Sequence, residues 1–234
     1  MKILLSALVA GLSMAALPAL AAELAPIAPM VPTTSVVPTT PPTPPLAQLP
    51  AAAAPAQPKI ARGLLLLHEG RVFMAPCRDR SYVNVEDVSE GGAVLAALRD
   101  FGLAPGYNLY VELMGVQEGG LLRVSGLNFA HATARCLGEA ENEEDWRALG
   151  LQAEWAAAAG AGALRVERAD ASELRTTYDA VKDDKGTRSI EAEGVALSFT
   201  PGLCRTADGK MLTGWHATLV PAGGGALEGC GWER

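Results

Sequence analysis

Cysteines are the residues of this chain most suited to covalent or metal chemistry. There are four of them, Cys77, Cys136, Cys204 and Cys230. None forms the close Cys-x-x-Cys pair of a thiolate metal site, and an even number of widely spaced cysteines is typical of cystines formed in an oxidising compartment. We therefore expect two disulfides, and the spacing together with the domain boundary argued below favours Cys77 with Cys136 and Cys204 with Cys230.

The histidines and the glycine-rich segments match no catalytic or ligand-binding motif. His68, His131 and His216 form no His-x-His or His-x-x-x-His pair, so they indicate no metal site. The stretch from Gly202 to Lys210 has six residues between its glycines, where a phosphate-binding loop has four, and Met211 follows the lysine in place of Ser or Thr. No Gly-x-Ser-x-Gly elbow occurs. The sequence predicts no catalytic residue, no cofactor and no bound metal.

A ligand near the C-terminus has three candidate contacts. Asp208 and Lys210 belong to a glycine-containing turn, and His216 follows on the next strand-like segment. Strand alternation turns Trp215 inward and His216 outward, which leaves the imidazole available to a ligand. Asp208, Lys210 and His216 are therefore the predicted ligand-site residues.

The N-terminal segments place the folded part outside the cytoplasm. Residues 1–21 combine one lysine, an apolar run and small residues at positions 19–21, which is typical of a secretory signal peptide. A retained membrane anchor is the alternative, because an apolar run of about 18 residues lies at the threshold for spanning a bilayer. Cleavage would leave a mature chain without an integral membrane span. The predicted location is the periplasm of a Gram-negative envelope.

The next segment, residues 22–59, contains eleven of the sixteen prolines and almost no charge. Proline fixes φ and removes a backbone donor, so this leader is predicted to be an extended linker rather than part of a sheet. It can act as a spacer or as a ligand for a proline-binding partner. The formal net charge of −7 and the absence of a basic cluster exclude nucleic acid as a partner. The predicted partners are an envelope protein or a small ligand.

Two domains are predicted in the rest of the chain. The acidic run from Glu139 to Asp145 lacks the pattern of a calcium loop, so residues 139–145 are interpreted as a solvated connector between domains at 60–138 and 146–234. The fold class is mainly β within the α+β class: two small antiparallel β-rich barrel or sheet domains, the first with one packed helix.

The first domain shows two hairpin patterns and one helix. Strands at 64–67 and 71–75 flank a Glu-Gly turn, residues 81–88 alternate as a half-buried strand, and two further strands flank residues 118–120. Between them Ser89 and Gly102 bracket a helix. Its apolar stripe consists of Val94, Leu95, Leu98 and Phe101.

The sequence of the second domain predicts consecutive hairpins, which implies antiparallel pairing. Asp184, Lys185 and Gly186 predict one of its turns. The alanine-rich stretch at 154–166 is compatible with helix or strand, and we favour a strand followed by a loop. All four tryptophans lie in this domain, where they could line a carbohydrate cleft, although tryptophans more often form the core of a small β-domain.

The C-terminal residues carry a family resemblance. The matching residues are Cys204, Asp208, Gly209, Gly214, Trp215, Ala217, Thr218, Leu219, Leu227, Gly229 and Cys230. This pattern resembles the end of an uncharacterised family of bacterial envelope proteins and lipoproteins related to the META/HslJ domain. Upstream, Gly150 and Trp155 match that family's Gly-x-Glu-Pro-x-Trp element, in which Gln152 and Ala153 replace Glu and Pro here.

The first domain is distantly similar to the copper-resistance lipoprotein NlpE. Pro76 and Cys77 are kept, but Arg80 stands where the second cysteine of that module would be, which argues against copper. Both resemblances imply a small β-rich fold and an envelope location. The expected function is non-enzymatic: binding, or a role in envelope stress or maintenance. The alternatives are an inhibitor of a cell-wall hydrolase, similar to lysozyme inhibitors, and a protein that handles copper or zinc.

Overall fold

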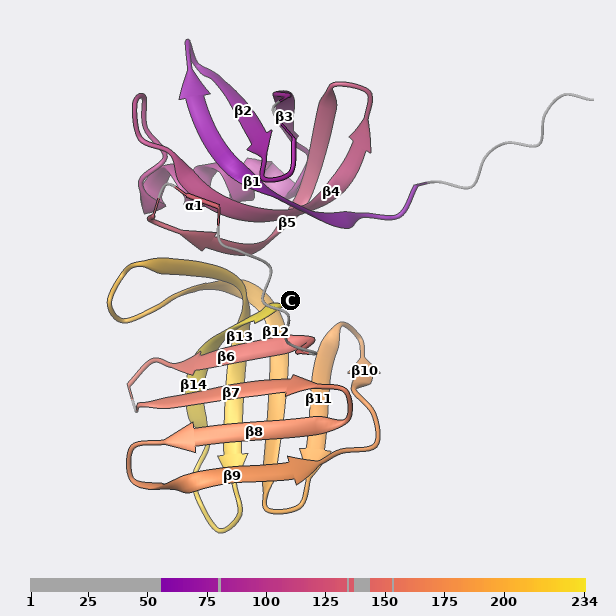
Figure 1. The fold of residues 1–234 in the computed structure, drawn as a ribbon, viewed down its shortest axis with the longest axis vertical. Helices are drawn as coiled ribbons and strands as arrows, with labels where there is room; N and C mark the ends of the chain where they lie inside the picture. The colour runs from indigo at the N-terminus through magenta and orange to yellow at the C-terminus, as the bar shows by residue number, and fades with distance from the viewer. Residues whose placement is uncertain (1–55, 80, 134, 137–143, 153) are drawn as a thin grey trace, which may run out of the picture. The chain divides into compact units, whose positions relative to one another are not determined.

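A computed structural model describes residues 56–234 apart from 80, 134, 137–143 and 153. The predicted signal peptide, most of the leader, most of the acidic connector and Arg80 lie outside the described residues. The described part is mainly β, as predicted (Figure 1). Its elements are β1 Lys59–His68, β2 Arg71–Pro76, β3 Val83–Asp87, a 3-10 turn Glu90–Gly92, α1 Ala93–Phe101, β4 Leu109–Glu118, β5 Leu121–His131, β6 Trp146–Gly150, β7 Trp155–Gly160, β8 Ala163–Arg168, β9 Ala171–Thr177, β10 Lys182–Asp184, β11 Thr187–Ala192, β12 Val195–Arg205, β13 Met211–Pro221 and β14 Leu227–Glu233.

Strands β1 to β5 are joined in a closed ring of pairings, called here the first ring. The order β4-β1-β2-β3 is a Greek key, and β5 lies beside both β4 and β3. A five-stranded Greek-key ring is the architecture of OB-type barrels. The two predicted hairpins are confirmed. The β3–β5 pair is parallel, which the prediction of antiparallel pairing did not include, because strand patterns do not show which distant segments pair.

Helix α1 packs on the first ring through the predicted stripe, and its four predicted apolar residues are all buried. The helix begins at Ala93, four residues after the predicted cap. Ser89 still serves its N-terminus, because the Val94 amide donates to the Ser89 hydroxyl at 3.2 Å. The Leu95 amide donates to Asp87 Oδ2 at 2.7 Å, so β3 itself supplies the second cap. Gly102 ends the helix as expected.

Strands β6 to β14, called here the second sheet, form two antiparallel meanders, β6 to β9 and β10 to β14, which are joined by the β6–β14 pair. The order is β10-β11-β12-β13-β14-β6-β7-β8-β9, and within the described residues no pairing joins β9 to β10. Figure 1 shows β6 to β9 crossing β11 to β13 at a steep angle, as in orthogonal β packing. The alanine-rich stretch is strand β7, as favoured, and a tight turn at Ala161 and Gly162 replaces the expected loop.

The core of the second sheet is aromatic, and small residues make room for it. Trp146 packs on Phe199 with ring centroids 4.5 Å apart and meets Trp215 edge-on at 5.1 Å. Ala157 and Ala159 of β7 line the same cluster. The tryptophans therefore pack as core residues, and Trp232 packs in a separate small cluster.

Strand alternation explains the sequence Gly229-Cys230-Gly231 in β14, because the two glycines share the face that is covered by aromatic rings. A Cβ at Gly229 would lie 2.5 Å from the Trp155 ring, and one at Gly231 would lie 2.5 Å from the Phe199 ring. Only glycine therefore allows these two rings to close over β14. The intervening Cys230 points to the other face.

Both disulfides occur in the favoured pairing. Cys77 is bonded to Cys136 and Cys204 to Cys230. The second one links β12 to β14 across the intervening strand β13, and both of its cysteines are buried. In the chain-entropy picture, closing a loop with a sequence separation of 26 residues stabilises the fold by roughly 3.5 kcal/mol.

The first ring and the second sheet are joined by β5 and β13. Thr213 pairs with Phe129 at this join, and Leu212 of β13 is buried in the core of the first ring. A Cβ at Gly214 would lie 1.7 Å from the Leu127 carbonyl oxygen. Residues from 52 onwards thus form one compact unit, and the predicted domain boundary stays a prediction.

A buried polar network ties the C-terminal strand to the first ring. Asn128 donates through Nδ2 to the Glu233 carbonyl at 2.7 Å and accepts from the Glu233 amide at 2.9 Å. The same Nδ2 donates to Glu112 Oε2 at 2.9 Å, and the Tyr110 hydroxyl donates to Glu112 Oε1 at 2.8 Å. Burial, followed by the charge of Glu112, raises the pKa of Tyr110. Arg62, with Nε 3.5 Å from Glu112 Oε1, compensates the carboxylate.

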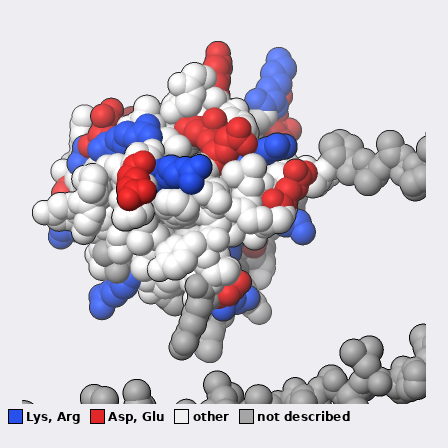
Figure 2. Space-filling model, turned by 90° about the horizontal axis from the view of Figure 1, so that it is seen from above, with Lys and Arg blue, Asp and Glu red and all other residues white. Residues whose placement is uncertain are grey.

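Charged side chains of both signs are mixed on the surface. Figure 2 shows a face on which Lys and Arg lie among Asp and Glu with uncharged surface between them. One such group on the first ring consists of Arg123 with Glu86 and Glu118.

No helix in the part of the chain that the structure describes combines the length and apolar character needed to cross a bilayer.

We expect Gly214→Ala to destabilise the protein strongly, because its methyl group would meet backbone of β5 that cannot move aside. The expected loss in free energy of unfolding is about 3 kcal/mol, measured by urea denaturation. Gly225→Ala is the matched control, since a Cβ there meets no atom within 4 Å. Equal stability of the two variants would contradict the close approach of β5 and β13.

We expect Asn128→Ala to lower the free energy of unfolding by about 3 kcal/mol, because it leaves buried groups of Glu233 and Glu112 without partners. Asn84→Ala is the control, since Asn84 is exposed on β3 and, among the described residues, is hydrogen-bonded through its backbone. A loss below 0.5 kcal/mol at Asn128 would show that the network does not hold the C-terminal strand.

Candidate functional site

Asp208 and Lys210 lie in the turn between β12 and β13, where they hold the turn itself. Asp208 Oδ1 accepts from the Thr206 hydroxyl at 2.7 Å and from the Lys210 amide at 3.1 Å. The Thr206 hydroxyl, and then the Lys210 amide, hold the pKa of Asp208 below its ordinary value. The Lys210 ammonium lies 4.0 Å from Asp208 Oδ2. The Asp208 carboxylate therefore already has hydrogen-bond and ion-pair partners within its own turn.

His216 does not join that turn. It is exposed on β13, five residues beyond Met211, which corresponds to roughly 17 Å along a strand. Its ring lies over Gly202, since a Cβ there would be 2.6 Å from His216 Cδ2. The three predicted ligand-site residues are thus spread over two places.

The imidazole near Asp208 is that of His131. His131 pairs with Met211 in the β5–β13 ladder. The electrostatic interaction of His131 with Asp208 also contributes to the lowered pKa of Asp208. His131 Nδ1 accepts from the Thr133 amide at 2.9 Å. Within the described residues, no group of three or more His, Cys, Asp or Glu side chains could hold a metal ion.

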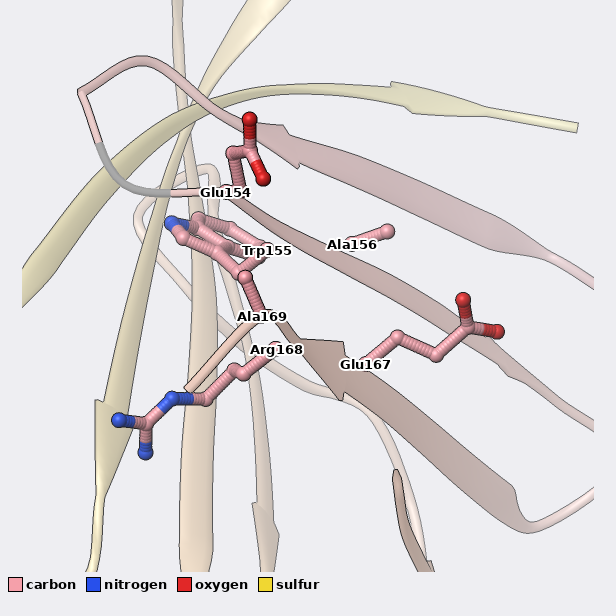
Figure 3. Close-up of a pocket in the computed structure, with 6 residues that line it drawn as sticks. All are labelled: Glu154, Trp155, Ala156, Glu167, Arg168 and Ala169. Carbon is pink, nitrogen blue, oxygen red and sulfur yellow. The ribbon is translucent and has the colours of Figure 1, made fainter. Parts of the chain in front are cut away.

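A pocket of about 430 Å³ lies at one end of the β7–β8 ladder and is called here the β7–β8 pocket. It is lined by Glu154, Trp155, Ala156, Glu167, Arg168 and Ala169. Trp155 pairs with Arg168 and Ala156 with Glu167. Figure 3 shows Trp155 and Arg168 extending to one side of this ladder, and Ala156 and Glu167 to the other.

Two of the three charged residues that line the β7–β8 pocket have ion-pair partners. Arg168 is 2.6 Å from Asp170, and Glu167 is 3.6 Å from Arg165. The indole nitrogen of Trp155 has no hydrogen-bond partner among the described residues, but the ring is packed against Gly229 in the core. Arg168 and Glu167 of this pocket are therefore already compensated by neighbouring charges.

The acidic connector ends in a charge cluster beside the same strands. Glu144 Oε2 is 2.5 Å from Arg147 Nε, and Glu144 Oε1 is 3.5 Å from Arg165. The hydrogen bond from Arg147 lowers the pKa of Glu144, more than burial raises it. The side chain of Glu144 is only 16% exposed. This residue therefore packs against the fold.

A second pocket, of about 250 Å³, lies where α1, the first ring and the second sheet meet; it is called here the apolar pocket. Its side chains are those of Val94 from α1, Met114 and Leu127 from β4 and β5, and Pro201, Leu203 and Trp215 from β12 and β13, with Ala93 and three glycines completing the lining. None of these lining residues is charged. Leu203 is 42% exposed at this pocket, whereas the other leucines of the described residues are buried or half-buried.

Three β-bulges lie at the strands that line the apolar pocket. On β12 the register shifts between Pro201 and Cys204, so Gly202 and Leu203 together stand opposite Gly214. On the first ring the register of β4 and β5 shifts on either side of Met114. Bulges re-aim side chains and are enriched beside functional sites. The bulge on β12 is what turns Leu203 out of the sheet.

Three glycines belong to the lining of the apolar pocket, namely Gly126, Gly202 and Gly214. A Cβ at Gly126 would make only an ordinary contact, 3.6 Å from Met114 Cβ, and the backbone there suits any residue. A larger side chain at this position would therefore occupy the pocket without disturbing the strand.

Comparisons of the chain with protein-family models, with curated proteins and with solved structures find no match in any of the three. The predicted relationship to META/HslJ and NlpE proteins stays a prediction.

Sequence reasoning did not find the apolar pocket. Its residues come from segments more than a hundred positions apart, and each is an ordinary apolar residue or glycine. The only available signal was the Pro201-Gly202-Leu203 sequence inside a strand pattern, because proline and glycine in a strand mark a bulge.

We expect Glu144→Gln to lower the free energy of unfolding by about 1 kcal/mol at pH 7, a modest value because both arginines are partly exposed. Since folding lowers the pKa of Glu144, its contribution is fully present above the ordinary Glu pKa of about 4.3 and is lost as the pH falls below it. Urea denaturation from pH 3 to 7 measures this. Glu173→Gln, in the exposed pair with Arg175, is the control. A difference that does not depend on pH would contradict the charge assignment.

Proposed function

We propose that this chain is a non-enzymatic binding protein of the bacterial cell envelope, with a role in envelope maintenance, and that the apolar pocket receives an apolar group of its ligand or partner. The observation that carries the proposal is the lining of the apolar pocket. Nonpolar side chains and glycines are presented there on bulged strands, with Leu203 and Trp215 incompletely buried. Burying apolar surface contributes roughly 25 cal/mol per Å², so such a pocket gains free energy from an apolar occupant.

The envelope location is supported by the two cystines, because disulfides persist in oxidising compartments. The same bonds favour a binding role. Cys204 lies next to the bulge that presents Leu203, and its bond to Cys230 fixes that bulge to β14. A site held rigid before binding loses less entropy when its ligand arrives.

The test uses N-phenyl-1-naphthylamine, an uncharged apolar dye whose fluorescence rises when it leaves water. We expect the dye to bind the mature chain, and Gly126→Val to weaken its binding about tenfold, because the added side chain fills the apolar pocket. Fluorescence titration measures the affinity, and thermal unfolding verifies that the variant is folded.

Gly120→Val is the matched control. Gly120 lies on the same hairpin, and a Cβ there meets no atom within 4 Å, so dye affinity is expected to stay unchanged. Equal dye affinity of the Gly126→Val variant and the unmodified chain would reject the apolar pocket as the binding site.

A further inference from the structure

One edge of strand β9 is open. β9 lies at the end of the strand order, and among the residues that the structure describes no strand pairs with its side away from β8. Figure 1 shows it as the outermost of strands β6 to β9. The strand has 7 residues and contains neither proline nor lysine. Unpaired amides and carbonyls on such an edge are a template for a further strand.

The β8–β9 ladder decides which backbone groups point to this edge. At the end of the ladder the Tyr178 amide donates to the Gly162 carbonyl at 2.9 Å. Hydrogen-bonded and non-hydrogen-bonded positions alternate along an antiparallel pair. The residues that share the parity of Tyr178 therefore direct their amides and carbonyls to β8, whereas Glu173, Arg175 and Thr177 direct theirs to the open edge. The bulge opposite Glu167 lies before this regular stretch.

Arg175 favours a carboxylate on its open side. It stands directly opposite Arg165 in the β8–β9 ladder, and like charges in that position destabilise a sheet. Glu173 Oε1, on the same strand, lies 2.5 Å from Arg175 Nε. The Arg175 side chain is nevertheless 72% exposed, so an acidic side chain on a further strand can reach it.

A second copy of β9 supplies that carboxylate. In antiparallel pairing centred on Leu174, Glu173 of each copy stands opposite Arg175 of the other, and two-fold symmetry repeats the pair. The backbone directions agree, because both residues point their amides and carbonyls to the open edge. Pairing centred on residue 173 would oppose two glutamates, and pairing centred on residue 175 would oppose two arginines. Within β9, pairing centred on Leu174 is the only register that opposes unlike charges.

The other face of β9 has matching chemistry. Leu174 is half-buried against the core of the second sheet, and this pairing places it beside Leu174 of the other copy. The position is a non-hydrogen-bonded pair, in which opposite Cα atoms are about 4.5 Å apart and side chains are closest. The two leucines therefore cover apolar surface that each chain alone leaves exposed.

We propose that β9 is a dimerisation edge, through which two copies of this chain pair antiparallel about Leu174 and join their second sheets. The interface uses none of the residues that line the apolar pocket, so it is independent of the proposed function. One strand pair buries little surface, and the expected dissociation constant is on the order of 10 µM.

Sedimentation equilibrium of the mature chain, over concentrations that span this dissociation constant, measures the dimer. Glu173→Arg and Arg175→Glu are each expected to weaken it about tenfold, because each opposes like charges at two symmetric places. Thermal unfolding verifies that the variants are folded. Glu191→Arg is the matched control: it makes the same change of charge in an exposed ion pair with Lys182 on β10 and β11, and is expected to leave the dimer unchanged.

Mixing the two single variants separates contacts between chains from the ion pair within β9. An equimolar mixture of the Glu173→Arg and Arg175→Glu chains is expected to form a heterodimer about as tight as the unmodified dimer, because unlike charges are opposed again at both places. The double variant is expected to dimerise like the unmodified chain for the same reason. A loss that arose within each chain would not be recovered by mixing.

Amide hydrogen exchange of the unmodified chain provides a readout that needs no variant. The amides of Glu173 and Arg175 are expected to exchange more slowly at high than at low protein concentration, because each donates across the pair. A chain that stays monomeric, single variants that dimerise as tightly as the unmodified chain, or a mixture without heterodimer would overturn the proposal. Exchange of these two amides that does not depend on concentration would also overturn it.

Discussion

A buried amide at the join of the two halves is the interaction on which the rest of the structure depends. Asn128 is the extra residue of a β-bulge in β5, since the pairing steps from Glu112–Phe129 to Leu113–Leu127 and leaves it unpaired. The bulge aims the Asn128 side chain at the main chain of Glu233 and at Glu112, so one amide forms hydrogen bonds with both the end of β14 and the buried carboxylate. Because Asn128 is fully buried, its amide has no water to replace these partners.

Glycines allow backbone and rings to approach each other closely, and bulges redirect side chains; both effects shape the core and the apolar pocket. Gly229 and Gly231 let aromatic rings approach β14, and Gly214 lets β13 approach β5. The close approach at Gly214 lies beside the bulge at Leu203. The strands do not pack completely against each other there, and the apolar pocket remains. The pocket is thus a consequence of joining two curved sheets through shared strands, and the proposed use of it requires no change of fold.

Local patterns predicted what depends on neighbouring residues. Alternation and turn chemistry located the hairpins, because Glu69 and Gly70, or Lys185 and Gly186, have the positive φ that such turns need. The stripe of α1 was correct in all four residues, since helix periodicity records burial directly. The helix begins later than predicted because Gly91 and Gly92 adopt positive φ, which a continuous α-helix does not allow. The candidate residues Asp208 and His216 looked close in sequence, but an extended strand separates them.

Cysteine number, hydrophobic alternation and glycine placement are properties of the sequence, and they determined the β class, the two cystines and the small core residues of β14. Only the tertiary structure decided which distant strands became neighbours: the parallel β3–β5 pair, the β5–β13 join and the meeting of Leu203, Trp215 and Met114. The reason is physical. Local preferences constrain φ, ψ and the face of each side chain, whereas long-range pairing depends on how whole sheets close and pack, which short segments of sequence do not encode.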